Sequence, residues 1–322
     1  MLAATDLLGC YPALITPMRE EEGELKIDFF HFYKMIEAVL DARCSGIVIA
    51  GTTGQSSTLS LEEHIELVAR GADYARGHAR RLGRSVQVIG SAGSNSTRES
   101  IFMMAEILKR AKVDAFLHVT GYYNNPPQEG LLKHYRTVAD YAGESDTAVI
   151  LYNVPGRTKS NIEAATCIKL ARHPAIIAVK EASGDLEQVQ AILDGTDRAT
   201  FTVVSGEDHL VADIIRRGGT GVISASANRW PAEFQSLTEL ALGGEHDKAE
   251  ALQKALLPCV EAVFCVKNPI PLAHMFNTGV RSPLVTIDEM TPENQEKAVA
   301  TINAALAIRR FPHVVPVTSM VG

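Results

Sequence analysis

The sequence predicts an α/β fold, a (β/α)8 TIM barrel with a C-terminal helical extension. Predicted strands and helices alternate about eight times over the first 230 residues with short connections, which indicates a parallel sheet covered by helices. The competing fold, an open doubly wound sheet, favours a glycine-rich turn after its first strand, where this chain has Thr16-Pro17. We therefore expect a barrel over residues 1–230 and a helical region packed on it over residues 231–322.

The first half of the expected barrel has clear helix starts. Asp28 is suited to cap a helix, because its carboxylate can accept hydrogen bonds from free N–H groups. Ser60 is followed three residues later by Glu63, which is the capping-box pattern. An acidic loop that contains a glycine is expected over residues 19–24. Strands are expected over residues 11–16, 46–50, 85–90, 114–120 and 147–152, and helices over residues 29–42, from Ser60 onward, 96–112 and 128–141.

The second half contains the most informative strand. An apolar, β-branched run opens at Ala175 and ends on Lys180 and Glu181, as in a strand buried on both faces. After Trp230 the alternation stops and only helices are expected. Further strands are expected over residues 201–205 and 221–225, and helices over residues 161–171, 186–193, 208–217, 231–242, 245–264 and 292–310.

Composition narrows the class of protein. Hydrophobic residues make up 46% of the chain and charged residues 21%, as in soluble globular proteins. The net charge of −7 argues against a nucleic-acid or anionic-membrane partner. No apolar run is long enough to span a bilayer, and the N-terminus lacks a signal-peptide pattern. The five cysteines show neither metal-ligand spacing nor a disulfide framework, so we expect a reduced, cytoplasmic protein without a metal site.

Lys180 is the residue around which we expect the site. A lysine at the C-terminal tip of a buried strand can place its amine in a pocket while the strand holds its stem. Partial desolvation disfavours an ammonium, and a neutral amine forms a Schiff base with a carbonyl. For this stretch alone, a lysine that simply leaves the sheet into solvent is the simpler alternative.

Loops that follow barrel strands share one face, and that face carries the active site. Gly51-Thr52-Thr53-Gly54 offers hydroxyls and free N–H groups for a carboxylate. Arg157, behind Pro155-Gly156, can bind a carboxylate through two parallel hydrogen bonds. Tyr122-Tyr123 and Tyr152 follow the fourth and fifth strands. Each feature alone could be structural, but together with Lys180 they indicate a Schiff-base lyase acting on a 2-oxo acid.

Five motifs resemble the dihydrodipicolinate synthase and N-acetylneuraminate lyase superfamily, over nearly the whole chain. The motifs are GTTG at 51–54, GYYN at 121–124, YNVPGRT at 152–158, VKEASG at 179–184 and GVIS at 221–224. The resemblance implies a class I, pyruvate-dependent aldolase that uses a covalent lysine–pyruvate imine and no cofactor. Thr53 and Arg157 are most similar to the dihydrodipicolinate synthase branch, whose second substrate is aspartate semialdehyde and whose product is 4-hydroxy-tetrahydrodipicolinate, on the route to lysine.

The resemblance also implies catalytic roles. Lys180 would form the imine, and Tyr152 would relay protons during imine formation and carbon–carbon bond formation. Thr52 would link Tyr152 to Tyr123, which in this family reaches in from a neighbouring subunit. The family is typically a homotetramer built as a dimer of tight dimers.

Binding roles follow in the same way. Thr53 would bind the pyruvate carboxylate, and Arg157 would bind the carboxylate of the aldehyde. Gly206 and Ile223 would line the floor of the pocket. A feedback site for lysine is implied at five positions, which are Ser56, His64, Asn95, Glu99 and Tyr122.

Three other functions remain open at this point. A lyase or dehydratase for a sugar-derived 2-oxo acid would share the mechanism. A binding or regulatory protein that has lost turnover would show altered catalytic positions, whereas Lys180, Tyr152, Tyr123 and Thr52 are all present. A metal-dependent aldolase on this fold would need a cluster of His, Asp or Glu at the strand ends, and none is visible at ligand spacing.

Overall fold

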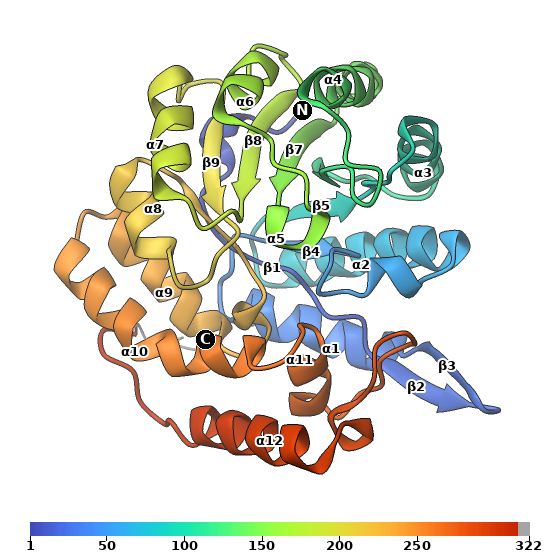
Figure 1. Cartoon of the computed structure of the whole chain (residues 1–322), viewed down its shortest axis with the longest axis vertical. Coiled ribbons are helices and arrows are strands. Elements are labelled where there is room, and N and C mark those ends of the chain that lie inside the picture. The colour runs from blue at the N-terminus through green and yellow to red at the C-terminus, as the bar shows by residue number, and fades with distance from the viewer. Residues whose placement is uncertain (315–322) are drawn as a thin grey trace.

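A computed structural model describes residues 1–314, in which eight parallel strands form a nearly closed barrel (Figure 1), so the predicted TIM barrel is confirmed. The ends of the sheet meet where Ala13 bridges Val48 and the amide of Leu14 donates to Val48 O at 2.9 Å. In their order around the barrel the strands are β1 (Gly9–Pro12), β10 (Gly221–Ser224), β9 (Thr202–Ser205), β8 (Ile176–Glu181), β7 (Ala148–Asn153), β6 (Ala115–Val119), β5 (Gln87–Ser91) and β4 (Gly46–Ile49).

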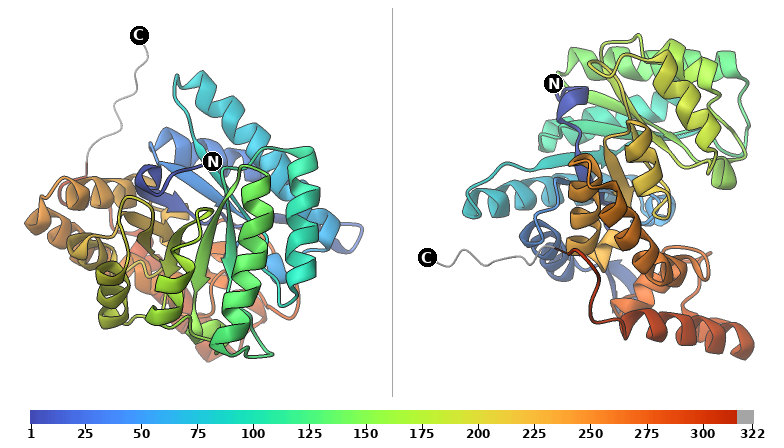
Figure 2. Two further views of the ribbon diagram at one scale, coloured as in Figure 1. Left: turned by 90° about the horizontal axis from the view of Figure 1, so that it is seen from above. Right: turned by 90° about the vertical axis from the view of Figure 1, so that its left-hand side faces the viewer.

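Helices surround the barrel (Figure 2), and the predicted caps start two of them. The Asp28 carboxylate accepts from the His31 amide, and Ser60 and Glu63 form a complete capping box. No helix within residues 1–314 is long and apolar enough to cross a membrane. The helices up to the end of the barrel are α1 (Phe29–Asp41), α2 (Leu61–Arg81), α3 (Thr97–Arg110), α4 (Gln128–Glu144), α5 (Pro155–Thr158), α6 (Ala164–Leu170), α7 (Leu186–Gly195), α8 (Val211–Arg217) and α9 (Pro231–Leu242).

The loop predicted over residues 19–24 is wrong, because this stretch belongs to an antiparallel hairpin. Strand β2 (Met18–Glu21) pairs with β3 (Glu24–Ile27), with Glu21 opposite Glu24. Glu22 and Gly23 form the turn, and both have positive φ angles, of 55° and 83°. This backbone is the one that two-residue hairpins require, but glutamate is unusual there and gave no turn signal.

The C-terminal region after Trp230 is helical, as expected. Helix α9 packs against β1, α8 and α1, and so completes the ring of helices around the barrel. Helix α12 (Pro292–Leu306) packs along α10 (His246–Phe264) at the lower edge of Figure 1. A short helix, α11 (Ile270–Met275), was not predicted. The predicted region extends to residue 322, and its residues 315–322 lie outside the described part of the chain.

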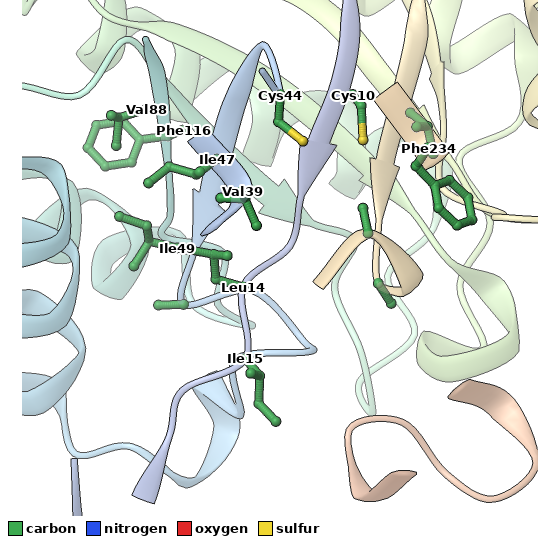
Figure 3. Packing of buried hydrophobic residues seen from close by; sticks show 14 of the residues in the cluster. Cys10, Leu14, Ile15, Val39, Cys44, Ile47, Ile49, Val88, Phe116 and Phe234 are labelled. Atoms are coloured by element: carbon green, nitrogen blue, oxygen red, sulfur yellow. The ribbon is translucent and has the colours of Figure 1, made fainter. Parts of the chain in front are cut away.

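Barrel side chains form two separate clusters. Alternate residues of each strand point into the barrel or toward the helices. In β8, Ala178 belongs to the interior cluster and Val179 to the outer one, so Lys180 points into the barrel. Figure 3 shows part of the outer cluster, where Leu14 and Ile49 meet Val39 of α1. The alternation of β8 thus directs the predicted Schiff-base lysine toward the barrel axis.

Candidate active site

Lys180 lies at the C-terminal end of β8, beside Tyr152 of the neighbouring strand β7. The two residues occupy paired register positions. The Lys180 side chain is buried, and its Nζ lies 4.2 Å from the centroid of the Tyr152 ring. The predicted imine-forming amine and proton-relaying phenol are therefore direct neighbours inside the barrel mouth.

Gly206, directly after β9, leaves space for the lysine. A Cβ at this position would lie 3.1 Å from Lys180 Cε and 2.7 Å from the Cβ of Ala182. The Gly206 amide donates to Glu181 O at 2.7 Å, which fixes the backbone this close. Ile223 of β10 is buried and contributes an apolar side chain to the same cavity. A side chain at position 206 would press on the lysine stem.

The loop Gly51–Gly54 after β4 is held against the barrel from two sides. Thr16 Oγ1 donates to Gly54 O at 2.6 Å. Asn268 Nδ2 donates to Thr53 Oγ1 at 3.0 Å, and both side chains are buried. A Cβ on Gly54 would lie 2.9 Å from Leu14 O, so this position requires glycine. Thr53 is thereby fixed at the edge of the cavity, where its hydroxyl can meet a carboxylate.

One cavity of about 70 Å³ brings seven of the eight predicted catalytic and substrate-binding residues together. Arg157 of α5 lies at its exposed edge, and its Nη2 donates to Asn268 O at 3.1 Å. The seven predicted residues in this lining are Thr52, Thr53, Tyr152, Arg157, Lys180, Gly206 and Ile223. An amine, a phenol, two hydroxyls and a guanidinium therefore face one small space.

Tyr123 is the predicted catalytic residue that lies outside this cavity. Its side chain is 96% exposed, and its φ of 68° is unusual for a residue with a side chain. An aromatic ring held in this way projects away from its own chain. Its role in a neighbouring subunit's site stays a prediction.

The predicted regulatory residues lie around an adjoining cavity of about 460 Å³, which shares Thr52, Tyr152 and Arg157 with the first. Ser56, His64, Glu99 and Tyr122 line it. Asn95 is not in the lining, but its Oδ1 accepts from the Tyr122 amide at 2.7 Å.

His64 is buried beside this second cavity. Its Nε2 lies 2.7 Å from Ser91 O, and burial lowers the pKa of the imidazole. The neutral ring therefore donates from Nε2 to the carbonyl.

The first cavity is also lined by two polar residues that were not predicted as site residues, Glu207 and Asn268. Burial and the neighbouring Asp208 raise the pKa of Glu207 to about 7, although Lys180 and Arg157 act in the opposite direction. A carboxyl of this kind beside a buried lysine is a functional candidate. Glu207 directly follows the predicted Gly206, and this adjacency was the available signal for it, whereas Asn268 is distant in sequence from the Thr53 that it contacts.

Glu181, the last residue of β8, points away from the cavity and fixes the strand end. Its carboxylate accepts from Asn153 Nδ2 at 3.0 Å, the Ser183 amide at 2.8 Å and Gln188 Nε2 at 3.1 Å. Burial raises its pKa, and the hydrogen bonds from Ser183 and Asn153 partly offset this effect. Within residues 1–314 no three His, Cys, Asp or Glu side chains are grouped so that they could hold a metal ion.

Comparison with known proteins points to one family. The model of the dihydrodipicolinate synthetase family matches residues 6–305. The chain is 38% identical over 299 residues to 4-hydroxy-tetrahydrodipicolinate synthase of Pseudomonas putida strain W619, a match that covers 91% of this chain and 97% of the relative.

Two solved structures have the same fold. The chloride-inhibited dihydrodipicolinate synthase of Acinetobacter baumannii complexed with pyruvate has a TM-score of 0.83 and 31% identity, and covers 94% of this chain and 100% of its own. The enzyme of Cyanidioschyzon merolae with lysine bound has a TM-score of 0.83 and 32% identity, and covers 94% and 99%. With the lysine, tyrosine and threonines in one cavity, these matches show that the chain belongs to the dihydrodipicolinate synthetase family of lyases.

Proposed function

We propose that this protein is a 4-hydroxy-tetrahydrodipicolinate synthase, which condenses pyruvate with aspartate semialdehyde through an imine on Lys180. The observation that carries the proposal is the buried Lys180 amine beside Tyr152, in a cavity that also holds Thr53 and Arg157. The Pseudomonas putida relative bears the name of this activity.

The first half of the reaction uses Lys180 and Tyr152. The lysine amine adds to C2 of pyruvate, and loss of one water gives a protonated imine. The imine withdraws electrons from the pyruvate methyl group, which loses a proton to form an enamine. The amine lies over the Tyr152 ring, and we assign to the phenol of Tyr152 the role of accepting and returning protons in these steps. Thr53 holds the pyruvate carboxylate, so that the reacting carbons are oriented for the next step.

The second half forms the carbon–carbon bond. The enamine carbon attacks the aldehyde, whose oxygen gains a proton and becomes the 4-hydroxyl of the product. The amino group of the semialdehyde then adds to the former C2 of pyruvate, closes the ring and releases Lys180. No cofactor takes part, because each step moves only protons and electron pairs between substrate and side chains.

Arg157 and Glu207 favour an amino-acid aldehyde over a sugar-derived 2-oxo acid. Their side chains place a positive and a negative group on the lining of one cavity. An amino acid carries a carboxylate for Arg157 and an ammonium for Glu207. A bound ammonium would favour the ionised form of Glu207, whose pKa of about 7 leaves it near half ionised at neutral pH. A sugar acid has no ammonium and would leave Glu207 without an ionic partner.

Borohydride trapping tests this proposal. The protein is incubated with pyruvate and reduced, and the Lys180 peptide is weighed by mass spectrometry. We expect a pyruvyl adduct on wild type and none on Lys180→Ala. Consumption of pyruvate in the presence of aspartate semialdehyde is then compared with the cleavage or dehydration of sugar-derived 2-oxo acids supplied alone. Absence of the adduct would contradict the imine mechanism, whereas an adduct with turnover of sugar acids alone would assign the alternative substrate class.

Assembly, location and regulation form a second part of the proposal. The exposed Tyr123 supports a homotetramer in which this ring completes a neighbouring site. All five cysteines are free, which supports a location in the cytoplasm. The second cavity supports feedback by lysine, which was bound in the Cyanidioschyzon merolae enzyme. A calorimetric titration with lysine that released no heat would contradict the regulatory proposal.

A further inference from the structure

The loop that carries Thr52 and Thr53 is bounded by two residues in an unusual backbone conformation. Ala50 and Gln55 have φ angles of 56° and 59°, and both are buried. Residues with a Cβ rarely adopt this region, so the surrounding structure must hold them there. The support for the Gln55 end comes from a distant part of the chain.

That support is Arg281, which follows α11 in the C-terminal region. The Arg281 amide donates to Gln55 Oε1 at 3.0 Å. Among residues 1–314 the Nε2 of Gln55 has no hydrogen-bond partner, so Arg281 provides the contact that orients this buried amide. Gln55 in turn closes the turn that contains the two threonines, since its own amide donates to Thr52 O at 3.1 Å.

The Arg281 side chain is itself fixed by three other segments. Its two terminal nitrogens bind Glu63 of α2 as a fork, at 2.6 Å each. The same guanidinium donates to Leu25 O of β3 and to Thr58 O. Side-chain exposure of Arg281 is only 19%, so this network is largely shielded from solvent. The backbone at residue 281 is therefore anchored independently of the loop that it contacts.

We propose that Arg281 is a positioning residue for the pyruvate-binding loop: it holds Gln55, and through Gln55 the Thr52–Thr53 segment, in the geometry that binds the substrate carboxylate. This inference rests on the proposed function for the identity of the carboxylate. Arg281 does not line the cavity and acts through other residues. The helical region outside the barrel thus determines part of the geometry of the catalytic cavity.

Arginine is required here by the shape of its contacts. A planar guanidinium can bind both oxygens of Glu63 and two backbone carbonyls at once. A lysine ammonium keeps the charge but can satisfy only part of this set. The hydrogen bonds from Arg281 are also the main cause of the lowered pKa of Glu63.

The test compares Arg281→Met and Arg281→Lys with a matched control, Arg110→Met. Arg110 also binds a glutamate of α2 through two nitrogens, Glu62 at 2.7 and 3.2 Å, but it does so on the outer face of α2 and α3. Borohydride trapping is measured against pyruvate concentration. We expect the half-saturating concentration to rise about ten-fold in Arg281→Met, and less in Arg281→Lys, with the same plateau of labelled protein. Arg110→Met should match wild type.

A second measurement needs no substrate. The amides of Gln55 and Ser56 bind Thr52 O and Gly51 O, so their hydrogen exchange reports on the loop. We expect faster exchange over residues 50–58 in both Arg281 variants and not in Arg110→Met. Unchanged exchange there would overturn the positioning role, as would a lower plateau with an unchanged half-saturating concentration. If pyruvate failed to label even wild type while exchange still rose, the proposed function would fail and the structural role of Arg281 would stand.

Discussion

Asn268 donates a hydrogen bond to Thr53, which decides what the threonine hydroxyl can do. Because Asn268 Nδ2 donates to Oγ1 at 3.0 Å, the hydroxyl proton stays free to be donated to a carboxylate in the cavity. Asn268 also accepts from Arg157 through its backbone oxygen. One residue outside the barrel thus orients both predicted carboxylate-binding groups.

Replacing Asn268 by Asp should weaken pyruvate binding. An aspartate would accept the Thr53 proton and add a negative charge near the carboxylate, so KM for pyruvate should rise about ten-fold or more. Steady-state kinetics with pyruvate varied at saturating aldehyde give this value. Asn268→Ala provides the comparison, because it removes the donor without adding charge. An unchanged KM in both variants would show that Thr53 does not bind the carboxylate.

Gly206→Ala should impair imine formation. The new Cβ would lie 3.1 Å from Lys180 Cε and 2.7 Å from the Cβ of Ala182, so the lysine stem and the residues after it must shift from their present positions. A displacement of this size can cost about 10²-fold in rate. Rapid-quench borohydride trapping measures the rate of imine formation. Gly156→Ala, where a Cβ would meet open space, is the matched control, and equal rates in both variants would refute the proposed crowding.

Glu207 should make the free protein less stable as pH rises through its titration range. Its pKa is raised to about 7 in the folded protein from an ordinary 4.5, so the folded state binds more protons between these values. The sign of the linkage follows: its contribution is fully present below pH 4.5 and is lost as pH rises through 7. Glu207→Gln should therefore melt a few degrees higher than wild type at pH 8, and this difference in Tm should be smaller at pH 5. Parallel melting curves across this range would contradict the assignment.

Tyr123→Phe should lower kcat by about 10²-fold. The fold and the fraction of Lys180 that forms the imine at equilibrium should stay unchanged. The ring is 96% exposed in the single chain, so removal of its hydroxyl breaks no contact within the fold. Mixing Tyr123→Phe with Lys180→Ala provides a check. If the tyrosine serves a neighbouring site, mixed oligomers should regain part of the activity that each variant lacks; failure to regain any would place its action elsewhere.

The sequence predicted the barrel well because strand periodicity and turn residues report on local burial. The strand that ends on Lys180 is an example, since its apolar run and its terminal lysine are both visible in the chain. The hairpin at Glu22-Gly23 was missed because a glutamate occupies a backbone conformation that usually selects glycine or asparagine. Local propensity contained no sign of this pairing.

Residues distant in sequence were the ones that the motifs could not place. Asn268 reaches Thr53 across more than 200 positions, and Arg281 reaches Gln55 across a similar separation. Such contacts depend on how the C-terminal region packs on the barrel, which no local pattern encodes. The pKa of Glu207 likewise depends on burial among groups from several strands.

The pairing of the first and last barrel strands affects the synthesis of the protein. β1 forms its longest strand pairing with β10, whose residues follow about 200 positions later. Its contact with β4 consists of a single bridge and nearby hydrogen bonds. At about 5–20 residues per second, a ribosome needs roughly 10–40 s to deliver that partner. During this interval one edge of the nascent sheet stays open, and this open edge makes the growing chain a candidate for chaperone binding before the ring is complete.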